Sequence, residues 1–315
     1  MSEEKKPLLV VAGPTASGKT ALGIALAKEL NGEVISADSM QIYKGLDIAT
    51  AKPTTDEMCG IPHHIISVID METKFSVADY VSLAKEKIDD ICLRGKLPIL
   101  VGGTGLYINS LVDNVDFSNA ETDGNVRAKL TNELELYGAE ILYERLKKID
   151  PETAEIVPVQ NTVRIIRALE IYELTGIKFS EYKRMNKGAE SLYKLCMIGL
   201  NYRDRQNLYD RINKRVGLMV ENGMIQECQE VFNTKKIGTA FQAIGYKELI
   251  PYFKKEASLE ECLDKIRLGS RRYAKRQLTW FRRDERINWI YMDEINNFNK
   301  IMEICKKIVA KSKIL

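Results

Sequence analysis

Patterns that bind structural metals or form disulfide frameworks are missing from this chain of 315 residues. Its six cysteines are scattered without a Cys-x-x-Cys pair, which excludes the usual zinc sites and is typical of thiols that fill a core in a reducing cytosol. The two histidines, His63 and His64, are adjacent and have no third ligand at metal spacing. We therefore interpret them as strand residues, not as a metal site.

Long apolar segments are also absent. No run approaches the roughly 20 residues that a membrane-spanning helix requires, so we expect no contact with membranes. Residues 1–7 are polar and contain no apolar core of a signal peptide. The sequence therefore predicts a cytoplasmic protein, and we expect it to act as a monomer.

The formal net charge of +3 hides an asymmetry between the two parts of the chain. Residues 1–199 carry 23 Lys and Arg against 29 Asp and Glu, whereas residues 200–315 carry 24 against 15. A basic C-terminal part favours a polyanionic partner. A solvated basic surface has the same composition, so charge alone leaves both interpretations open.

A phosphate-binding motif stands in the N-terminal segment. The apolar run 8–12 is typical of a buried strand and residues 21–30 of a helix; between them GPTASGKT matches G-x-x-x-x-G-K-[ST]. The loop's backbone N–H groups would cradle phosphate, with Lys19 adding a charge and Thr20 a hydroxyl for Mg²⁺. The predicted diphosphate- or nucleotide-binding residues are Gly13, Pro14, Thr15, Ala16, Ser17, Gly18, Lys19 and Thr20.

Strands and helices alternate on both sides of an all-helical segment. Further strands are predicted at 33–37, 63–68, 97–101, 195–200 and 288–291, and helices at 76–93, 204–220, 258–283 and 301–308. This alternation predicts an α/β fold, a P-loop NTPase-like core with a parallel sheet flanked by helices. The core would comprise residues 1–113 and 195–315, and residues 114–194 would form a helical insertion domain.

Asp38 is the best candidate for a general base. It follows the strand 33–37, so it is expected at the same sheet edge as the phosphate loop. A carboxylate there could accept a proton from a nucleophile that attacks beside a phosphate-bearing leaving group. Orienting Mg²⁺ and capping the next helix are the alternatives.

A second carboxylate is missing where P-loop NTPases have one. The strand 97–101 ends in Gly102-Gly103, not in the Asp that helps to hold Mg²⁺. Its absence argues against a motor-type ATPase and favours a kinase-like or diphosphate-handling enzyme. The paired glycines either let the backbone approach a ligand, which would present Thr104 to the crevice, or form only a tight turn.

The helix 258–283 mixes cations with aromatic side chains. Its cations include Arg271, Arg272, Lys275, Arg276 and Arg282, interleaved with Tyr273, Trp280 and Phe281. Such a mixture suits RNA, because cations neutralise phosphates and aromatic rings stack on bases. A solvated helix anchored by its aromatic residues is the alternative.

Taken together, these residues resemble the tRNA dimethylallyltransferases, also called tRNA isopentenyltransferases. The matching blocks run in family order from about residue 8 to residue 283: GPTASGKT at 13–20, DSMQIY at 38–43, TAKP at 50–53, PHH at 62–64, GGTGLY at 102–107, QN at 160–161 with Arg164, RALE at 167–170, QAIGYKE at 242–248 and YAKRQLTWFR at 273–282. Eukaryotic relatives carry a C-terminal zinc finger that has no counterpart here, so the chain is similar to the bacterial type.

The resemblance implies transfer of a dimethylallyl group from dimethylallyl diphosphate to N6 of adenosine 37, in tRNAs that read codons beginning with U. The adenine would leave the anticodon-loop stack to reach the site, and the helical insertion would grip the anticodon stem-loop. The implied catalytic residues are Asp38, Lys19, Thr20, Arg215 and Thr104, with Mg²⁺ on Thr20. The implied tRNA-binding residues are Asp38, Ser39, Met40, Gln41, Thr104, Gln160, Asn161, Thr162, Val163, Arg164, Gln242, Lys275, Arg276, Trp280 and Arg282.

Three other functions remain as alternatives. An adenylate isopentenyltransferase shares the phosphate loop and the Asp, but the helical insertion and the basic helix favour tRNA. A nucleoside or nucleotide kinase would transfer a γ-phosphoryl group from ATP. An RNA-binding module with a degenerate loop is disfavoured by the intact Lys19, Thr20 and Asp38.

Overall fold

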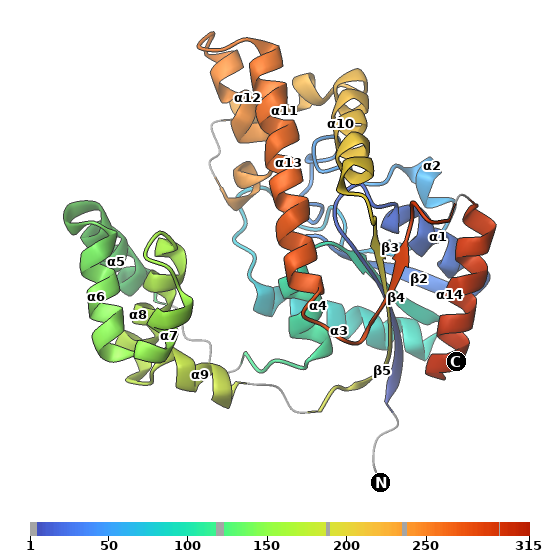
Figure 1. Ribbon diagram of the computed structural model, residues 1–315, viewed down its shortest axis with the longest axis horizontal. Helices are drawn as coiled ribbons and strands as arrows, with labels where there is room; N and C mark the ends of the chain where they lie inside the picture. The colour runs from blue at the N-terminus through green and yellow to red at the C-terminus, as the bar shows by residue number, and fades with distance from the viewer. Residues whose placement is uncertain (1–4, 118–122, 187–189, 235–237, 296) are drawn as a thin grey trace. The chain divides into compact units, whose positions relative to one another are not determined.

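Six parallel strands form one sheet within the residues that the computed structural model describes, which are 5–117, 123–186, 190–234, 238–295 and 297–315 (Figure 1). The strand order is β3-β2-β4-β1-β5-β6, and every pair is parallel. The strands are β1 (Lys6–Ala12), β2 (Gly32–Ala37), β3 (His63–His64), β4 (Leu97–Gly102), β5 (Tyr193–Asn201) and β6 (Ile287–Tyr291). The α/β fold with a parallel sheet, predicted from the sequence, is confirmed. Because β1 lies between β4 and β5, the loop that follows it opens near the middle of the sheet edge.

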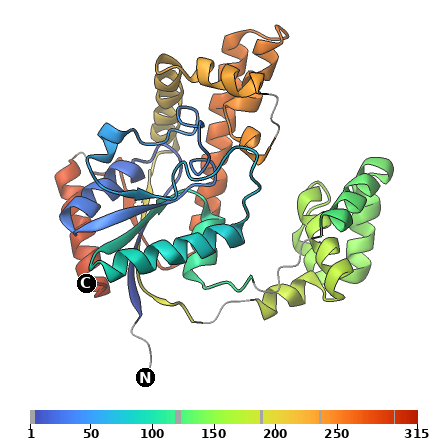
Figure 2. The same ribbon diagram turned by 180° about the vertical axis from the view of Figure 1, so that it is seen from behind.

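Helices cover both faces of this sheet (Figures 1 and 2). Helices α1 and α14 pack on one face and α3 and α4 on the other. The helices in the part of the chain that contains the sheet are α1 (Lys19–Glu29), α2 (Thr55–Met58), α3 (Val77–Leu93), α4 (Gly105–Val112), α10 (Arg205–Glu221), α11 (Met224–Asn233), the 3₁₀ turn η1 (Thr239–Gln242), α12 (Tyr246–Phe253), α13 (Leu259–Phe281) and α14 (Phe298–Ser312).

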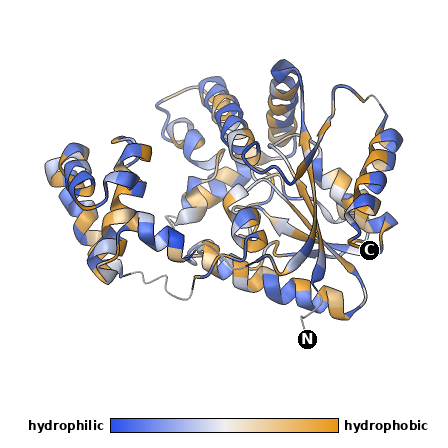
Figure 3. Ribbon diagram, turned by 60° about the horizontal axis from the view of Figure 1, so that its bottom comes forward, coloured by the Kyte–Doolittle hydropathy of each residue, from blue (hydrophilic) through white to orange (hydrophobic). Residues whose placement is uncertain are grey.

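Both faces of the central strands are buried, as the near-continuous apolar runs of parallel strands require. On one face Leu9 and Val11 pack with Leu22 of α1 and with Ile301 and Val309 of α14. Figure 3 shows hydrophobic residues concentrated along the sheet, while the helices carry hydrophilic residues on their outer sides. The buried sheet is therefore a rigid support for the loops at its edge.

The strand predicted at residues 63–68 is wrong beyond its first two residues. Only His63 and His64 pair with β2. Ile65 and Ser67 have φ angles of 60° and 52°, in the left-handed region, which a strand cannot contain. Local signals mark helix ends elsewhere: Ser258 caps α13 by accepting from the N–H of Glu261, and Gly176 ends α8 (Thr162–Thr175) in the left-handed conformation.

The chain divides into two compact units, Met1–Val112 with Ser191–Leu315, and Asp113–Glu190. Within the described residues the second unit is helical, with α5 (Gly124–Tyr137), α6 (Ala139–Ile149), α7 (Pro151–Ile156), α8 (Thr162–Thr175) and α9 (Phe179–Met185). Its core includes Leu130, Leu142 and Leu169. Of the helices in the described part of the chain, none combines the length and apolarity needed to cross a membrane.

Candidate active site

The phosphate loop joins β1 to α1 and has the conformation that its glycines permit. Gly18 has φ 93° and stands before the first turn of α1, where no side chain caps the helix. The N–H groups of that turn therefore remain available to an anion. A Cβ at Gly13 would lie 2.9 Å from the carbonyl oxygen of Leu200 and equally close to Ser17 Oγ, so only glycine fits there.

Lys19 is a cation in unfavourable surroundings. Its ammonium donates to the carbonyl oxygen of Pro14 at 3.2 Å. Burial and the nearby guanidinium of Arg215 lower the pKa of Lys19 to about 8, while the carboxylate of Asp38 acts in the opposite direction. An anion placed between Lys19 and Arg215 would relieve this repulsion, as the diphosphate of a substrate would.

Arg215 reaches the phosphate loop from α10. Its Nη1 donates to Thr15 Oγ1 at 2.9 Å, across 200 residues of sequence. Burial lowers the pKa of the Arg215 guanidinium, and Asp38 partly offsets the effect. The neighbouring Arg211 donates from Nε to the carbonyl oxygen of Ala16 at 3.0 Å. One helix thus brings two arginines to the loop, and Arg215 is the less exposed of the two.

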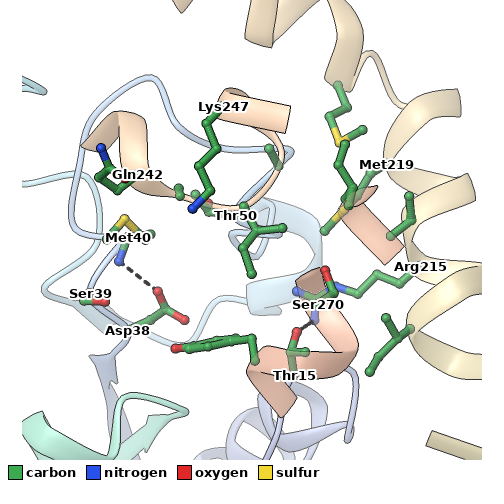
Figure 4. A pocket seen from close by; sticks show the side chains of 18 of the residues that line it. Thr15, Asp38, Ser39, Met40, Thr50, Arg215, Met219, Gln242, Lys247 and Ser270 are labelled. Atoms are coloured by element: carbon green, nitrogen blue, oxygen red, sulfur yellow. Dashed lines mark hydrogen bonds between the residues drawn. The ribbon is translucent and has the colours of Figure 1, made fainter. Parts of the chain in front are cut away.

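Asp38 follows β2, and its two carboxylate oxygens have different surroundings. Oδ1 accepts from the backbone N–H groups of Met40 at 2.9 Å and Gln41 at 3.3 Å. Among the described residues, no group donates a hydrogen bond to Oδ2. Asp38 therefore holds a turn through one oxygen and presents the other to the cavity (Figure 4). Residues 39–54 contain no helix and Thr54 caps α2, so the helix-capping alternative is wrong.

Thr104 and Gln41 hold the segment that follows Asp38. Thr104 Oγ1 accepts from the N–H of Ser39 at 3.1 Å. Gln41 Nε2 donates to the carbonyl oxygens of Thr50 and Ala51, at 3.3 and 3.1 Å, while its Oε1 accepts from Ser36. The sequence predicted both side chains as tRNA ligands; the structure shows that both also tie protein segments together.

A cavity of about 230 Å³ opens above these residues. Thr15, Asp38 and Arg215 line one side, and Gln242 and Lys247 lie across from them (Figure 4). The remaining wall is largely apolar, with Met40, Ile212, Val216, Met219, Met224, Ile244 and Ile266. A polar floor beside an apolar wall suits a ligand with a charged head and a short hydrocarbon tail.

Gly102, Gly103 and Gly105 are required by neighbouring protein atoms. A Cβ at Gly102 would lie 2.2 Å from the carbonyl oxygen of Ala37, and one at Gly103 would lie 2.2 Å from Gln277 Nε2. At Gly105 a Cβ would lie 2.3 Å from Trp280 Cδ1. At Gly102 and Gly103, where the sequence left open a close approach to a ligand or a tight turn, the close neighbours are protein atoms.

The predicted tRNA ligands of α13 differ in their exposure. Lys275, Arg276 and Arg282 are exposed, as a surface that contacts phosphates requires. Trp280 is half-buried, and its Nε1 donates to Asn109 Oδ1 at 3.0 Å. The indole therefore anchors α13 to α4, which is the structural role that aromatic residues of a basic helix can also have.

Residues 160–164 lie in the second unit, at the start of α8. Asn161 caps that helix, with its Oδ1 accepting from the N–H of Arg164 at 3.4 Å. Val163 is 77% exposed. Their predicted role in holding nucleotides stays a prediction.

Sequence reasoning assigned no role to Gln277 or Glu227, although both organise the cavity wall. Glu227 accepts from the N–H groups of Asp47, Ile48 and Ala49 at 2.7–3.0 Å and from the Tyr246 hydroxyl at 2.6 Å. Nothing local marks Glu227, because its three backbone partners lie 178 to 180 residues away. Gln277 lies within the block YAKRQLTWFR, which resembles the family, but its contacts are visible only in the folded protein.

The protein supplies few ligands for a metal ion. In the part of the chain that the structure describes, no three His, Cys, Asp or Glu side chains gather to hold one. Thr20, in the first turn of α1, offers a hydroxyl beside the phosphate loop. Magnesium at phosphate sites takes most of its ligands from the substrate and from water, so this sparse donor set fits an ion that arrives with a diphosphate.

Comparisons with known proteins agree with this geometry. The family model described as IPP transferase matches residues 41–284. A tRNA dimethylallyltransferase of Thermoanaerobacter sp. is 49% identical over 309 residues, which cover 96% of this chain and 97% of the relative. One from Halalkalibacterium halodurans is 46% identical and covers 98% of both chains.

Solved structures agree as well. The crystal structure of the full-length tRNA isopentenylpyrophosphate transferase from Bacillus halodurans superposes with a TM-score of 0.74 at 45% identity, covering 98% of this chain and 97% of that one. A eukaryotic dimethylallyltransferase acting on tRNA superposes with a TM-score of 0.81 at 31% identity, over 97% of this chain and 80% of that chain.

Proposed function

This chain belongs to the IPP transferase family, and we propose that it transfers a dimethylallyl group from dimethylallyl diphosphate to N6 of adenosine 37 in tRNA. The tRNAs would be those that read codons beginning with U, and the products N6-isopentenyladenosine and diphosphate. One observation carries the proposal: a cavity is lined together by Thr15 of the phosphate loop, by Arg215 and by Asp38, whose Oδ2 accepts no hydrogen bond from the described residues.

The reaction is an alkyl transfer in which N6 attacks the first carbon of the allyl group. The carbon–oxygen bond to the diphosphate breaks, and its electron pair leaves with the diphosphate. Lys19 and Arg215 stabilise the negative charge that develops on this leaving group. Asp38 Oδ2 accepts the N6 proton, while Oδ1 keeps its backbone partners.

The apolar wall would hold the hydrocarbon part of the donor. Ile212, Val216 and Met219 come from successive turns of α10, the helix that also carries Arg215. They would pack against the dimethylallyl group while Arg215 holds its diphosphate. Excluding water from this wall protects an allylic carbon with cationic character from hydrolysis.

Enzymes that transfer prenyl groups from a diphosphate generally need a divalent cation, and we propose Mg²⁺ for this one. Thr20 would contribute its hydroxyl, and the diphosphate and water the other ligands. When bound, the ion supplies positive charge that stabilises the leaving diphosphate.

The tRNA is proposed to bind through its backbone to exposed cations and through the flipped base to the cavity. The exposed face of α13 supplies the cations, and the helical unit would contact the anticodon stem-loop. Ser39, Met40, Gln41, Thr104 and Gln242 line or border the cavity and would face the adenine and its neighbours. Since the described cavity is built by one chain, we propose that a monomer suffices, and that the protein works in the cytoplasm, where tRNA is used.

The deciding experiment offers the protein labelled dimethylallyl diphosphate together with either an unmodified anticodon stem-loop or AMP. We expect label in the RNA, at N6 of adenosine 37, and none when that position is guanosine. Label in AMP alone would reject the tRNA substrate. Transfer of γ-phosphate from labelled ATP, with no prenyl donor present, would instead indicate a kinase.

The basic face of α13 predicts a strong salt dependence of tRNA binding. Arg282→Ala should weaken the anticodon stem-loop complex and lower the slope of log Kd against log salt by about one, since roughly one counterion is released per phosphate contact. Titrations between about 50 and 200 mM salt measure it. An unchanged slope would show that Arg282 contacts no phosphate.

The low pKa of Lys19 predicts that donor binding weakens at alkaline pH. In the free protein Lys19 loses its proton as the pH rises through about 8, whereas a bound diphosphate favours the charged form. The affinity for dimethylallyl diphosphate should therefore fall by up to about tenfold per pH unit above that value. In a Lys19→Met variant the affinity should be lower throughout and this part of the pH dependence should vanish. Equal pH profiles would contradict the assignment.

A further inference from the structure

Gln277 is a buried polar side chain that connects two loops of the cavity. Its side chain, on α13, is 5% exposed. Oε1 accepts from the backbone N–H of Thr15 at 2.8 Å, and Nε2 donates to the carbonyl oxygen of Gly103 at 2.9 Å. The amide therefore bridges the phosphate loop after β1 and the turn after β4.

Each of these loops positions one side of the proposed chemistry. On the diphosphate side, Thr15 accepts the hydrogen bond of Arg215 through its hydroxyl. On the other side, Thr104 follows Gly103 directly and accepts from the N–H of Ser39, the residue after Asp38. Gln277 thus bonds directly to Thr15, which binds Arg215. It also bonds to Gly103, the residue before Thr104, which supports the Asp38 loop.

The bond to Thr15 also limits how the loop can bind phosphate. The Thr15 N–H is already paired, so it is not among the donors that the loop offers to an anion. The N–H groups at the start of α1 remain available, together with the cations Lys19 and Arg215. Gln277 therefore helps to determine which part of the loop holds the diphosphate.

The turn after β4 is shaped to receive this amide. A Cβ at Gly103 would lie only 2.2 Å from Gln277 Nε2. The φ of Gly103 is not among the positive values of the chain, so its backbone conformation does not require glycine. Space for the amide is what requires it.

Packing alone does not account for a glutamine here. Neighbouring positions of α13 already bury Ala274, Leu278 and Phe281, and an apolar side chain would fill the site without the cost of burying an amide. Both polar atoms of the Gln277 amide are paired, each with a loop at the reaction centre.

We propose that Gln277 is a positioning residue for the prenyl transfer: its amide fixes the phosphate loop to the Gly103–Thr104 turn, and so aligns the leaving diphosphate with the carboxylate that takes the N6 proton. This role rests on the proposed function. It is distinct from tRNA binding by the exposed cations of the same helix.

The test compares Gln277→Met, similar in size but unable to form either bond, with the same substitution at the exposed Gln229 of α11. For Gln277→Met we expect kcat to fall about 10- to 100-fold, because small misplacements of reacting groups are costly. Its affinity for inorganic pyrophosphate should fall as well. Its affinity for the anticodon stem-loop should stay within about twofold, and Gln229→Met should match the wild type in all three measurements.

A double-mutant cycle provides the second measurement and does not depend on one variant folding. Gly103→Ala should displace the amide and reproduce the loss in turnover. In Gln277→Ala with Gly103→Ala the new methyl group meets no amide, so the double variant should be no slower than Gln277→Ala alone. Additive effects, or a Gln277→Met turnover within about twofold of the wild type, would overturn the proposal even if the thermal midpoint falls.

The pyrophosphate measurement separates this proposal from the proposed function. If the wild type transfers no dimethylallyl group, the function is rejected, while a selective loss of pyrophosphate affinity in Gln277→Met would still show that Gln277 positions the phosphate loop. If the wild type is active and pyrophosphate binding is unchanged in Gln277→Met, the positioning role is rejected and the function stands.

Discussion

An Asp38→Asn enzyme is expected to transfer the dimethylallyl group about 100 to 10,000 times more slowly than the wild type, the usual contribution of a general base. The asparagine can keep the structural half of the role, since its Oδ1 can still accept from the N–H groups of Met40 and Gln41. Its Nδ2 takes the place of Oδ2 and cannot accept a proton. Single-turnover kinetics with saturating tRNA and donor measure the chemical step.

Two measurements on the same variants separate this loss from a disturbed loop. Affinity for the anticodon stem-loop should change by no more than about twofold in Asp38→Asn. Asp38→Ala removes the backbone acceptor as well, so it should add a loss of thermal stability and of tRNA affinity. If Asp38→Asn turns over at the wild-type rate, the proton leaves N6 by another route, and Asp38 only shapes the loop.

Replacing Arg215 with methionine should lower kcat about 100- to 1,000-fold, the range found when one donor to a developing anion is removed. The guanidinium lies beside the phosphate loop in the free protein and would contact the diphosphate most strongly as its bond to carbon breaks. We therefore expect kcat to fall more than the KM for dimethylallyl diphosphate rises. Steady-state kinetics at several donor concentrations provide both constants.

The matched control is Arg205→Met, because Arg205 is exposed and is the first residue of the same helix. It removes an equal charge and should leave kcat within about twofold of the wild type. Equal losses in the two variants would mean that the overall charge of α10 matters and that the contact of Arg215 with Thr15 does not.

The parts of the site that could be predicted from the sequence are those encoded locally. The phosphate loop is a continuous motif between a strand and a helix, and Asp38 follows directly from the end of β2. Strand ends of a parallel sheet meet at one edge, so the proximity of these segments followed from the fold class alone. Helix caps are local in the same way, since the capping box of Ser258 and Glu261 lies within four residues.

What could not be predicted depends on contacts between distant segments. The bonds of Gln277 to Thr15 and Gly103 span 262 and 174 residues, and no periodicity reports them. The predicted strand at 63–68 failed because tertiary contacts hold Ile65 and Ser67 at positive φ, against the preference of a β-branched residue. Trp280 illustrates a third case, since an aromatic residue among arginines has the same pattern whether it faces RNA or anchors its helix.

The partly buried cations Lys19 and Arg215 affect the stability of the enzyme when no donor is bound. The unfolded chain leaves Lys19 fully hydrated, whereas the folded, ligand-free protein holds it beside Arg215 at a lowered pKa. Between about pH 8 and pH 10.5 Lys19 binds more protons in the unfolded chain, so its own contribution to folding becomes more favourable as the pH rises through that window. At neutral pH the destabilisation is present in full, and a diphosphate removes it by binding only the folded state. The donor thus supplies the negative charge that this part of the fold lacks, and the stability of the enzyme would rise with the concentration of isoprenoid diphosphate.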